Sequence, residues 1–157
     1  MFQIYLGGMQ VASLLFNTQN MELGRIQKEW VKSLREHPER QMSDFLGKVV
    51  DRDEYKACCL GELLCVRARL ENKPPPFVYG SIWDGDNSSS LTSSYGGLGL
   101  RSNNGGFEID EEIRIFMKDS RIEKTDSLAS LNDSGVKWPI IADFVEAFPD
   151  KIFTKSV

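Results

Sequence analysis

The sequence predicts an α+β fold, in which a single compact domain packs several helices with a small antiparallel sheet or hairpin. Apolar residues recur at helical spacing in three segments, 25–37, 57–70 and 127–151. The short apolar segment 45–50 is bounded by charged residues and indicates a strand. The chain has 157 residues, 41% of them hydrophobic. A chain of this size buries roughly 68 to 70% of its unfolded surface, enough for one core without a metal or disulfide.

The first predicted helix, 25–37, carries its apolar residues on one stripe. Trp30 is expected to anchor this stripe in the core, and Pro38 follows the last turn as a stop signal. After the strand at 45–50, residues 51–54 read as a charged turn. The sequence therefore predicts that the globular domain starts with a helix, a strand and a turn.

The second predicted helix, 57–70, repeats apolar residues at the four-three-four spacing of a buried face. This face consists of Cys59, Leu63, Val66 and Leu70. Charged residues at the C-terminal end of the helix are expected to be exposed to solvent. We expect the helix to pack against the first one.

All three cysteines lie at the start of this helix, between residues 58 and 65. On a helix, Cys58 and Cys65 are two turns, about 10 Å, apart, which is too far for one metal ion. Cys58 and Cys59 point about 100° apart, and His37 is the single histidine. The sequence therefore predicts no metal site, and three buried thiols in a reducing compartment.

Residues 72–106 change character, with three prolines followed by Asp, Asn, Ser and Gly. This composition favours an irregular segment, with a hairpin turn at 103–106. Long irregular segments in compact domains often carry binding residues. The candidate ligand-binding residues are Trp83 and Tyr95, for stacking on a base, Arg101, for holding phosphate, and Asn103, whose backbone lets a ligand approach. Partial calcium-loop and dinucleotide-binding patterns occur here, and both lack required positions.

Two interpretations remain open for residues 107–117. Phe107, Ile109, Ile113 and Ile115 alternate as in a strand. The same stretch also fits one helical face after an Asp110 cap. The neighbouring carboxylates read as a solvated charged face.

The C-terminal part predicts a helical hairpin. A short helix ends at Gly135, and Pro139 stands near the start of a second helix. This outline is shared by DNA-reading motifs, but the second helix carries Asp143 and Glu146 and would face phosphates with the wrong sign. The net charge of −4 likewise gives no attraction for a polyanion, so no nucleic-acid partner is expected.

Residues 1–20 form an apolar N-terminal extension to the predicted globular domain, 21–157. The extension has no basic residue before its apolar run, and polar residues interrupt it, so neither a signal peptide nor a membrane span is predicted. Residues 2–6 are expected to form a strand that contacts the body or joins two copies as a homodimer.

Several of these patterns occur together in one known family. The opening-helix tryptophan, the CCLGELLC helix at 58–65 and the closing LASLNDSG with IADFVE, within 128–146, resemble a family of small proteins carried by tailed phages and prophages. The resemblance covers about residues 24–148 and carries over no catalytic residue.

The resemblance implies a phage-type accessory protein in the cytoplasm of a bacterial host, acting in counter-defence. The favoured hypothesis is non-enzymatic binding or sequestration of a small nucleotide-like ligand, without a cofactor. The alternative is a protein-interaction module that binds a host factor. An enzyme acting through carboxylates ranks last, because the sequence shows no nucleophile and base together.

Overall fold

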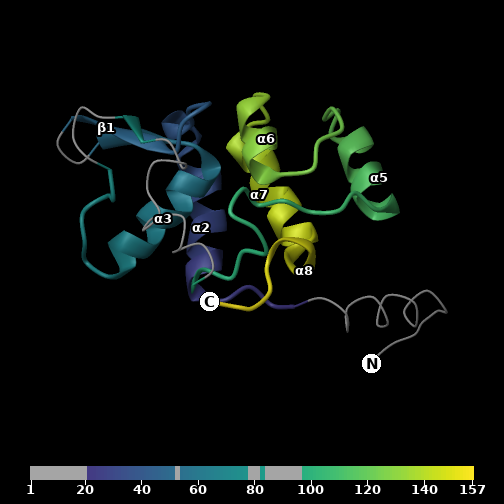
Figure 1. The fold of residues 1–157 in the computed structure, drawn as a ribbon, viewed down its shortest axis with the longest axis horizontal. Helices are drawn as coiled ribbons and strands as arrows, with labels where there is room; N and C mark the ends of the chain where they lie inside the picture. Colours follow the sequence, from purple (N-terminus) through teal and green to yellow (C-terminus); the bar gives the residue numbers. More distant parts are fainter. Residues whose placement is uncertain (1–20, 52–53, 78–81, 84–96) are drawn as a thin grey trace.

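The computed structural model describes residues 21–51, 54–77, 82–83 and 97–157 (Figure 1). It confirms the α+β prediction, with several helices and a small antiparallel sheet that lies at one end of the molecule. The elements in chain order are α2 (Arg25–Glu36), the 3₁₀ helix η1 (Pro38–Arg40), β1 (Gly47–Asp51), β2 (Glu54–Ala57), α3 (Cys59–Leu70), β3 (Ile82–Trp83), α5 (Glu111–Asp119), α6 (Leu128–Asp133), α7 (Trp138–Ala147) and α8 (Pro149–Ile152).

The sheet has the strand order β2-β1-β3, with both pairs antiparallel. The strand predicted at 45–50 is confirmed as β1, but β2 was missed. Ala57 pairs with Gly47 at the end of β2, so the helix predicted from Ala57 begins only at Cys59. With four residues, β2 is too short to show a distinct period, which is why the helical pattern was extended into it.

Helix α2 packs against α3 and α7 and forms the centre of the molecule. Its predicted stripe is confirmed, and Trp30 is fully buried. The Trp30 Nε1 donates a hydrogen bond of 2.8 Å to the carbonyl of Cys59, and the ring packs edge-on against Phe153. Trp30 therefore joins the first helix to α3 and to the end of the chain.

The C-terminal helical hairpin is confirmed as α6 and α7. Helix α6 ends where Gly135 adopts a φ of 91°, and the amide of Val136 reaches back to the carbonyl of Leu131. Asn132 is fully buried; its Oδ1 accepts hydrogen bonds from the amide of Cys59 and from the Trp138 indole, at 3.0 and 2.9 Å. This side chain joins α3, α6 and α7.

Residues 111–119 are helical, which decides between the two interpretations left open. Asp110 caps α5, because its Oδ1 accepts the amide of Ile113 at 2.9 Å. The strand-like alternation arose because Phe107 and Ile109 precede the helix in an irregular segment.

The hairpin predicted at 103–106 is wrong, although the chain does turn there. Leu100 pairs with Phe153, whereas Gly106 pairs with Ser127. The two arms of the turn thus find their partners in different C-terminal segments instead of in each other.

Across the described residues, every helix is too short or too polar to cross a bilayer. The predicted N-terminal strand and its dimer contact, within 1–20, lie outside the described residues, as do residues 52–53 of the predicted charged turn.

Candidate functional site

The structure describes three of the four predicted ligand-binding residues, Trp83, Arg101 and Asn103. Trp83 belongs to β3, where its backbone pairs with Gly47. Tyr95 lies outside the described residues. Arg101 and Asn103 are exposed on the turn that joins the middle of the chain to its C-terminal part. Arg101 and Asn103 share one described segment, and a binding role for the four residues stays a prediction.

Arg101 borders a hollow of about 680 Å³ between this turn and the start of α8. Its Nε donates to the carbonyl of Asp150 at 2.9 Å, and Lys151 pairs with Asp110 at 2.8 Å. The hydrogen bond from Lys151 holds the pKa of Asp110 below its usual value, and Asp110 in turn raises the pKa of Lys151. Three carboxylates against two basic side chains make this hollow a weak attractor for phosphate. Its lining consists of Arg101, Ser102, Gly106, Phe107, Glu108, Asp110, Asp150 and Lys151.

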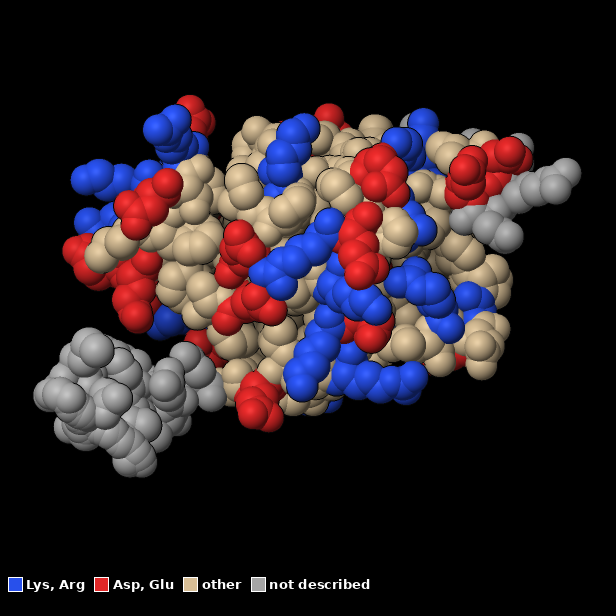
Figure 2. All heavy atoms as spheres, turned by 180° about the vertical axis from the view of Figure 1, so that it is seen from behind, with Lys and Arg blue, Asp and Glu red and all other residues tan. Residues whose placement is uncertain are grey.

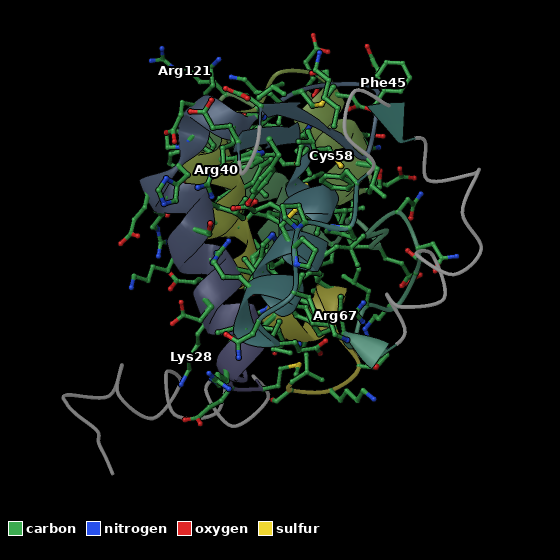
Figure 3. All side chains as sticks on the ribbon, turned by 90° about the vertical axis from the view of Figure 1, so that its left-hand side faces the viewer. Lys28, Arg40, Phe45, Cys58, Arg67 and Arg121 are labelled. Carbon is green, nitrogen blue, oxygen red and sulfur yellow. The ribbon has the colours of Figure 1, made fainter. Side chains whose placement is uncertain are left out.

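The three thiols are buried, which confirms their predicted core role. Figure 3 shows Cys58 inside the body, where its sulfur caps α3 by accepting the amide of Gly61. Burial raises the pKa of Cys58 to about 11 and those of Cys59 and Cys65 well above the usual value. These thiols remain protonated at neutral pH, so they lack the thiolate that nucleophilic chemistry requires.

A buried carboxylate lies on another face of α3. Glu62 is fully buried, and both Ser33 and Tyr55 donate hydrogen bonds to it. Arg40 lies 3.3 Å from the same carboxylate and also bonds the Tyr55 hydroxyl at 3.1 Å. Burial is the main cause that raises the pKa of Tyr55. Each polar group has a partner, so we interpret the cluster as a structural network joining α2, β2 and α3.

The sequence analysis missed this network, although one signal was present. Glu62 falls inside the apolar run of α3, beside Leu63 on the buried face. A lone acidic residue at such a position indicates a buried charge with partners elsewhere in the chain.

Helix α5 lies at one edge of the molecule, away from α2 and α3 (Figure 1). An aromatic cluster attaches it to the body. Phe116 packs edge-on against Phe144 and Phe148, with ring centroids 5.5 and 5.7 Å apart, and Phe107 packs at a tilt against Phe144, with centroids 4.8 Å apart. One side of α5 is therefore fixed in the core.

The other side of α5 exposes an apolar residue. Ile115 has 53% of its surface exposed, compared with 3% for Met117 on the inner side. Beside Ile115 lies an open hollow of about 480 Å³. We name it the α5 groove; its lining consists of Glu111, Arg114, Ile115, Met117, Lys118, Ile122 and Lys124.

The end of α5 shapes this groove. Arg121 adopts a φ of 58°, which reverses the chain so that the amide of Ile122 donates to the carbonyl of Met117 at 2.8 Å. This is the Schellman arrangement, in which the residue after the turn usually packs on the last helical turn. The backbone thus returns Ile122 towards Met117 and gives the groove its apolar floor.

Among the charged residues that line the groove, three are basic and one is acidic. Arg114 pairs with Glu111 at 2.9 Å, and Lys118 and Lys124 are exposed. Figure 2 shows the molecule from behind, so that the end that carries α5 is on the left. Basic side chains gather over the upper part of that end, and acidic side chains lie mainly below them. Acidic residues at the helix start and basic residues at its end also suit the helix dipole.

The sequence contained one indication of this surface. If 111–119 is a helix, Ile113, Phe116 and Met117 share a face, and Ile115 falls outside it. The strand interpretation concealed this, because it placed Ile113 and Ile115 on the same side.

Comparison with known proteins gave no match: no family model, no curated protein and no solved structure matches this chain. The candidate site therefore rests on the contacts of the chain itself.

Proposed function

We propose that this protein is a non-enzymatic protein-interaction module and that the α5 groove is the surface that binds its partner. The observation that carries the proposal is the exposed Ile115, which lies beside a groove with a floor of Met117 and Ile122. Among the large apolar residues of the described part of the chain, Ile115 is the most exposed. Exposed apolar surface that is bordered by polar residues often marks an interaction site.

The shape of the α5 groove suits a protein better than a small molecule. Small-ligand sites usually enclose most of the ligand surface, whereas this groove is shallow and open along one side of α5. Full burial of an isoleucine side chain contributes roughly 1.5 to 3 kcal/mol, and about half of the Ile115 surface is still available.

The resemblance to tailed-phage and prophage proteins supplies a setting for the proposal. In that setting the partner is a host factor in the bacterial cytoplasm, and binding blunts a host defence. This part of the proposal rests on the CCLG and LND patterns alone.

Site-specific photo-crosslinking in bacterial cells tests the proposal. A photoreactive phenylalanine analogue replaces Ile115 in one variant and Val50 in a control, since Val50 is also exposed, at 41%, but lies on β1. We expect a discrete adduct with one protein from position 115 and not from position 50. No adduct at 115, or the same adducts from both positions, would overturn the proposal.

A second candidate function is the binding of a small nucleotide-like ligand in the hollow beside Arg101. Its volume of about 680 Å³ favours this candidate, because ligand sites commonly measure about 300 to 1,000 Å³. A thermal-shift screen with nucleotides tests it. A binding nucleotide should raise the melting temperature, and Arg101→Ala should remove at least about 1.5 kcal/mol of affinity. If no nucleotide raises the melting temperature, this candidate fails.

A further inference from the structure

Resting on the proposed function, we infer that the occupant of the α5 groove is an acidic amphipathic helix of the partner protein. The inference joins two properties of the groove: an apolar floor and a mainly basic rim. Among its charged lining residues, Arg114, Lys118 and Lys124 are basic and only Glu111 is acidic. Acidic side chains on a partner complement this rim.

The free charge lies at the C-terminal end of the groove. Arg114 and Glu111 pair with each other at 2.9 Å, so these two lining charges offset one another. Lys118 and Lys124 lie further along, where both are exposed. A partner's carboxylates therefore find their counter-charges beside the last turn of α5 and the segment after it.

A helix fits the groove because its apolar residues recur along one face. Ile115 on α5 and Ile122 on the returning chain are the apolar lining residues that keep accessible surface, whereas Met117 is buried. A bound helix with apolar residues at positions i, i+3, i+4 and i+7 would cover both isoleucines and direct its acidic flanks towards the lysines. An extended strand would need an unpaired sheet edge, which a helix surface does not offer.

The backbone at Arg121 adds an independent indication. The same left-handed position after α6 is occupied by Gly135, and after α3 by Asn72. Glycine and asparagine tolerate this conformation, whereas a long side chain is strained there. Arg121 thus adds an exposed positive charge near the groove, on the outer surface in Figure 3, at a cost in strain.

Two other occupants are less complementary. Residues 1–20 are apolar but carry no charged residue, so they would leave Lys118 and Lys124 without partners. A second copy that docked through the same groove would bring two basic rims together. Both enter the experiment as outcomes.

Fluorescence anisotropy with the full chain tests the inference. One labelled peptide is an amphipathic helix with leucines on one face and glutamates beside them, and the other has lysines in place of the glutamates. We expect the acidic peptide to bind at least tenfold more tightly at low salt, and the preference to shrink as salt rises. Equal binding of the two peptides, or binding of neither, would overturn the inference.

Matched variants locate the binding. The double variant Lys118→Glu and Lys124→Glu should lose the preference for the acidic peptide and keep its melting temperature. The control, Lys28→Glu and Lys32→Glu, makes the same charge change on the exposed side of α2 and should keep the preference. If the control loses it as well, net charge and not the groove selects the peptide, and the inference fails.

Two measurements address the other occupants. If acidic-peptide binding appears only after residues 1–20 are deleted, the chain's own extension fills the groove. If sedimentation shows a dimer that the Lys118→Glu and Lys124→Glu variant dissociates, a second copy fills it. Either result overturns the inference.

The two proposals fail in different ways. A discrete crosslink at position 115 without a preference for the acidic peptide leaves the protein-interaction function standing and removes the acidic helix. No crosslink at position 115 removes the interaction function, whatever the peptides show.

Discussion

Helices α2 and α5 are both amphipathic, yet the fold treats their apolar residues differently. On α2, Trp30, Val31 and Leu34 are all buried against α3 and α7. On α5, Ile113 and Met117 are buried, but Ile115 remains more than half exposed. The apolar residues of α2 are all part of the core. Helix α5 buries one of its sides in the core and leaves the apolar Ile115 exposed on another side.

The difference shows what distinguishes a packing residue from a binding residue in this chain. Burial of a polar residue does not by itself indicate a binding site. Glu62 is a fully buried acidic residue, yet Ser33 and Tyr55 of the same chain donate hydrogen bonds to it. Ile115 keeps 53% of its surface exposed, and basic residues border it. The surface that the fold leaves incomplete is the one available to a partner.

Removing the anchor of α2 should have the largest effect. Trp30→Ala deletes a fully buried indole together with its hydrogen bond to Cys59. We expect the free energy of unfolding to fall by about 3 to 5 kcal/mol, measured by urea denaturation. Lys32→Ala, on the exposed side of the same helix, should stay within about 0.5 kcal/mol of the wild type. A loss below about 1 kcal/mol for Trp30→Ala would contradict its role as the core anchor.

Removing the attachment of α5 should have a smaller effect. Phe116 is only partly buried but makes two edge-on aromatic contacts, with Phe144 and Phe148. Phe116→Ala should lower the free energy of unfolding by about 1 to 3 kcal/mol. Hydrogen exchange should increase in α5 and remain slow in α2. Equal increases in both helices would show that α5 belongs to the central core after all.

The cap of α5 should make the edge of the molecule sensitive to acid. Asp110 bonds the amide of Ile113, and the hydrogen bond from Lys151 is the main cause that holds its pKa below the ordinary value of 3.8. A carboxylate with a lowered pKa stabilises the fold above that ordinary value, and its contribution is lost as the pH falls through the lowered pKa.

Asp110→Ala should therefore cost about 1 kcal/mol near neutral pH, and the difference from wild type should shrink below about pH 4. Urea denaturation at a series of pH values measures this difference. If the stability difference between wild type and Asp110→Ala stays constant down to pH 2, the charge of Asp110 does not contribute to its capping of α5.

The strained end of α5 predicts the smallest change, with the opposite sign. Arg121→Gly relieves a left-handed backbone conformation at φ 58°. The strain that is relieved exceeds the conformational entropy that glycine loses on folding, so the free energy of unfolding should rise by about 0.5 to 1 kcal/mol. The same variant should bind the acidic peptide more weakly, because a positive charge is gone. A destabilised Arg121→Gly variant would show that the arginine has packing contacts that favour it.

Local patterns predicted the parts of the fold that depend on local chemistry. The apolar stripe of α2, the stop at Gly135 and the Asp110 cap were all visible as spacing or as cap residues. The buried thiols followed from their place on the apolar face of α3.

The misplaced parts depend on distant partners. Strand β2 exists because Tyr55 and Ala57 pair with β1. The arms of the 101–106 turn pair with Phe153 and Ser127, far along the chain. The α5 groove requires Ile122 to fold back on Met117, which depends on a left-handed Arg121 that composition does not indicate.

The most direct test of the account compares Ile115→Glu with Val50→Glu. Both residues are exposed and apolar, but only Ile115 borders the α5 groove. The free energy of unfolding and the affinity for the partner captured from position 115 are measured on the same samples. We predict that both variants stay within about 0.5 kcal/mol of wild-type stability, and that only Ile115→Glu loses binding, by at least tenfold. Unchanged binding by Ile115→Glu, or an equal loss from Val50→Glu, would contradict the account.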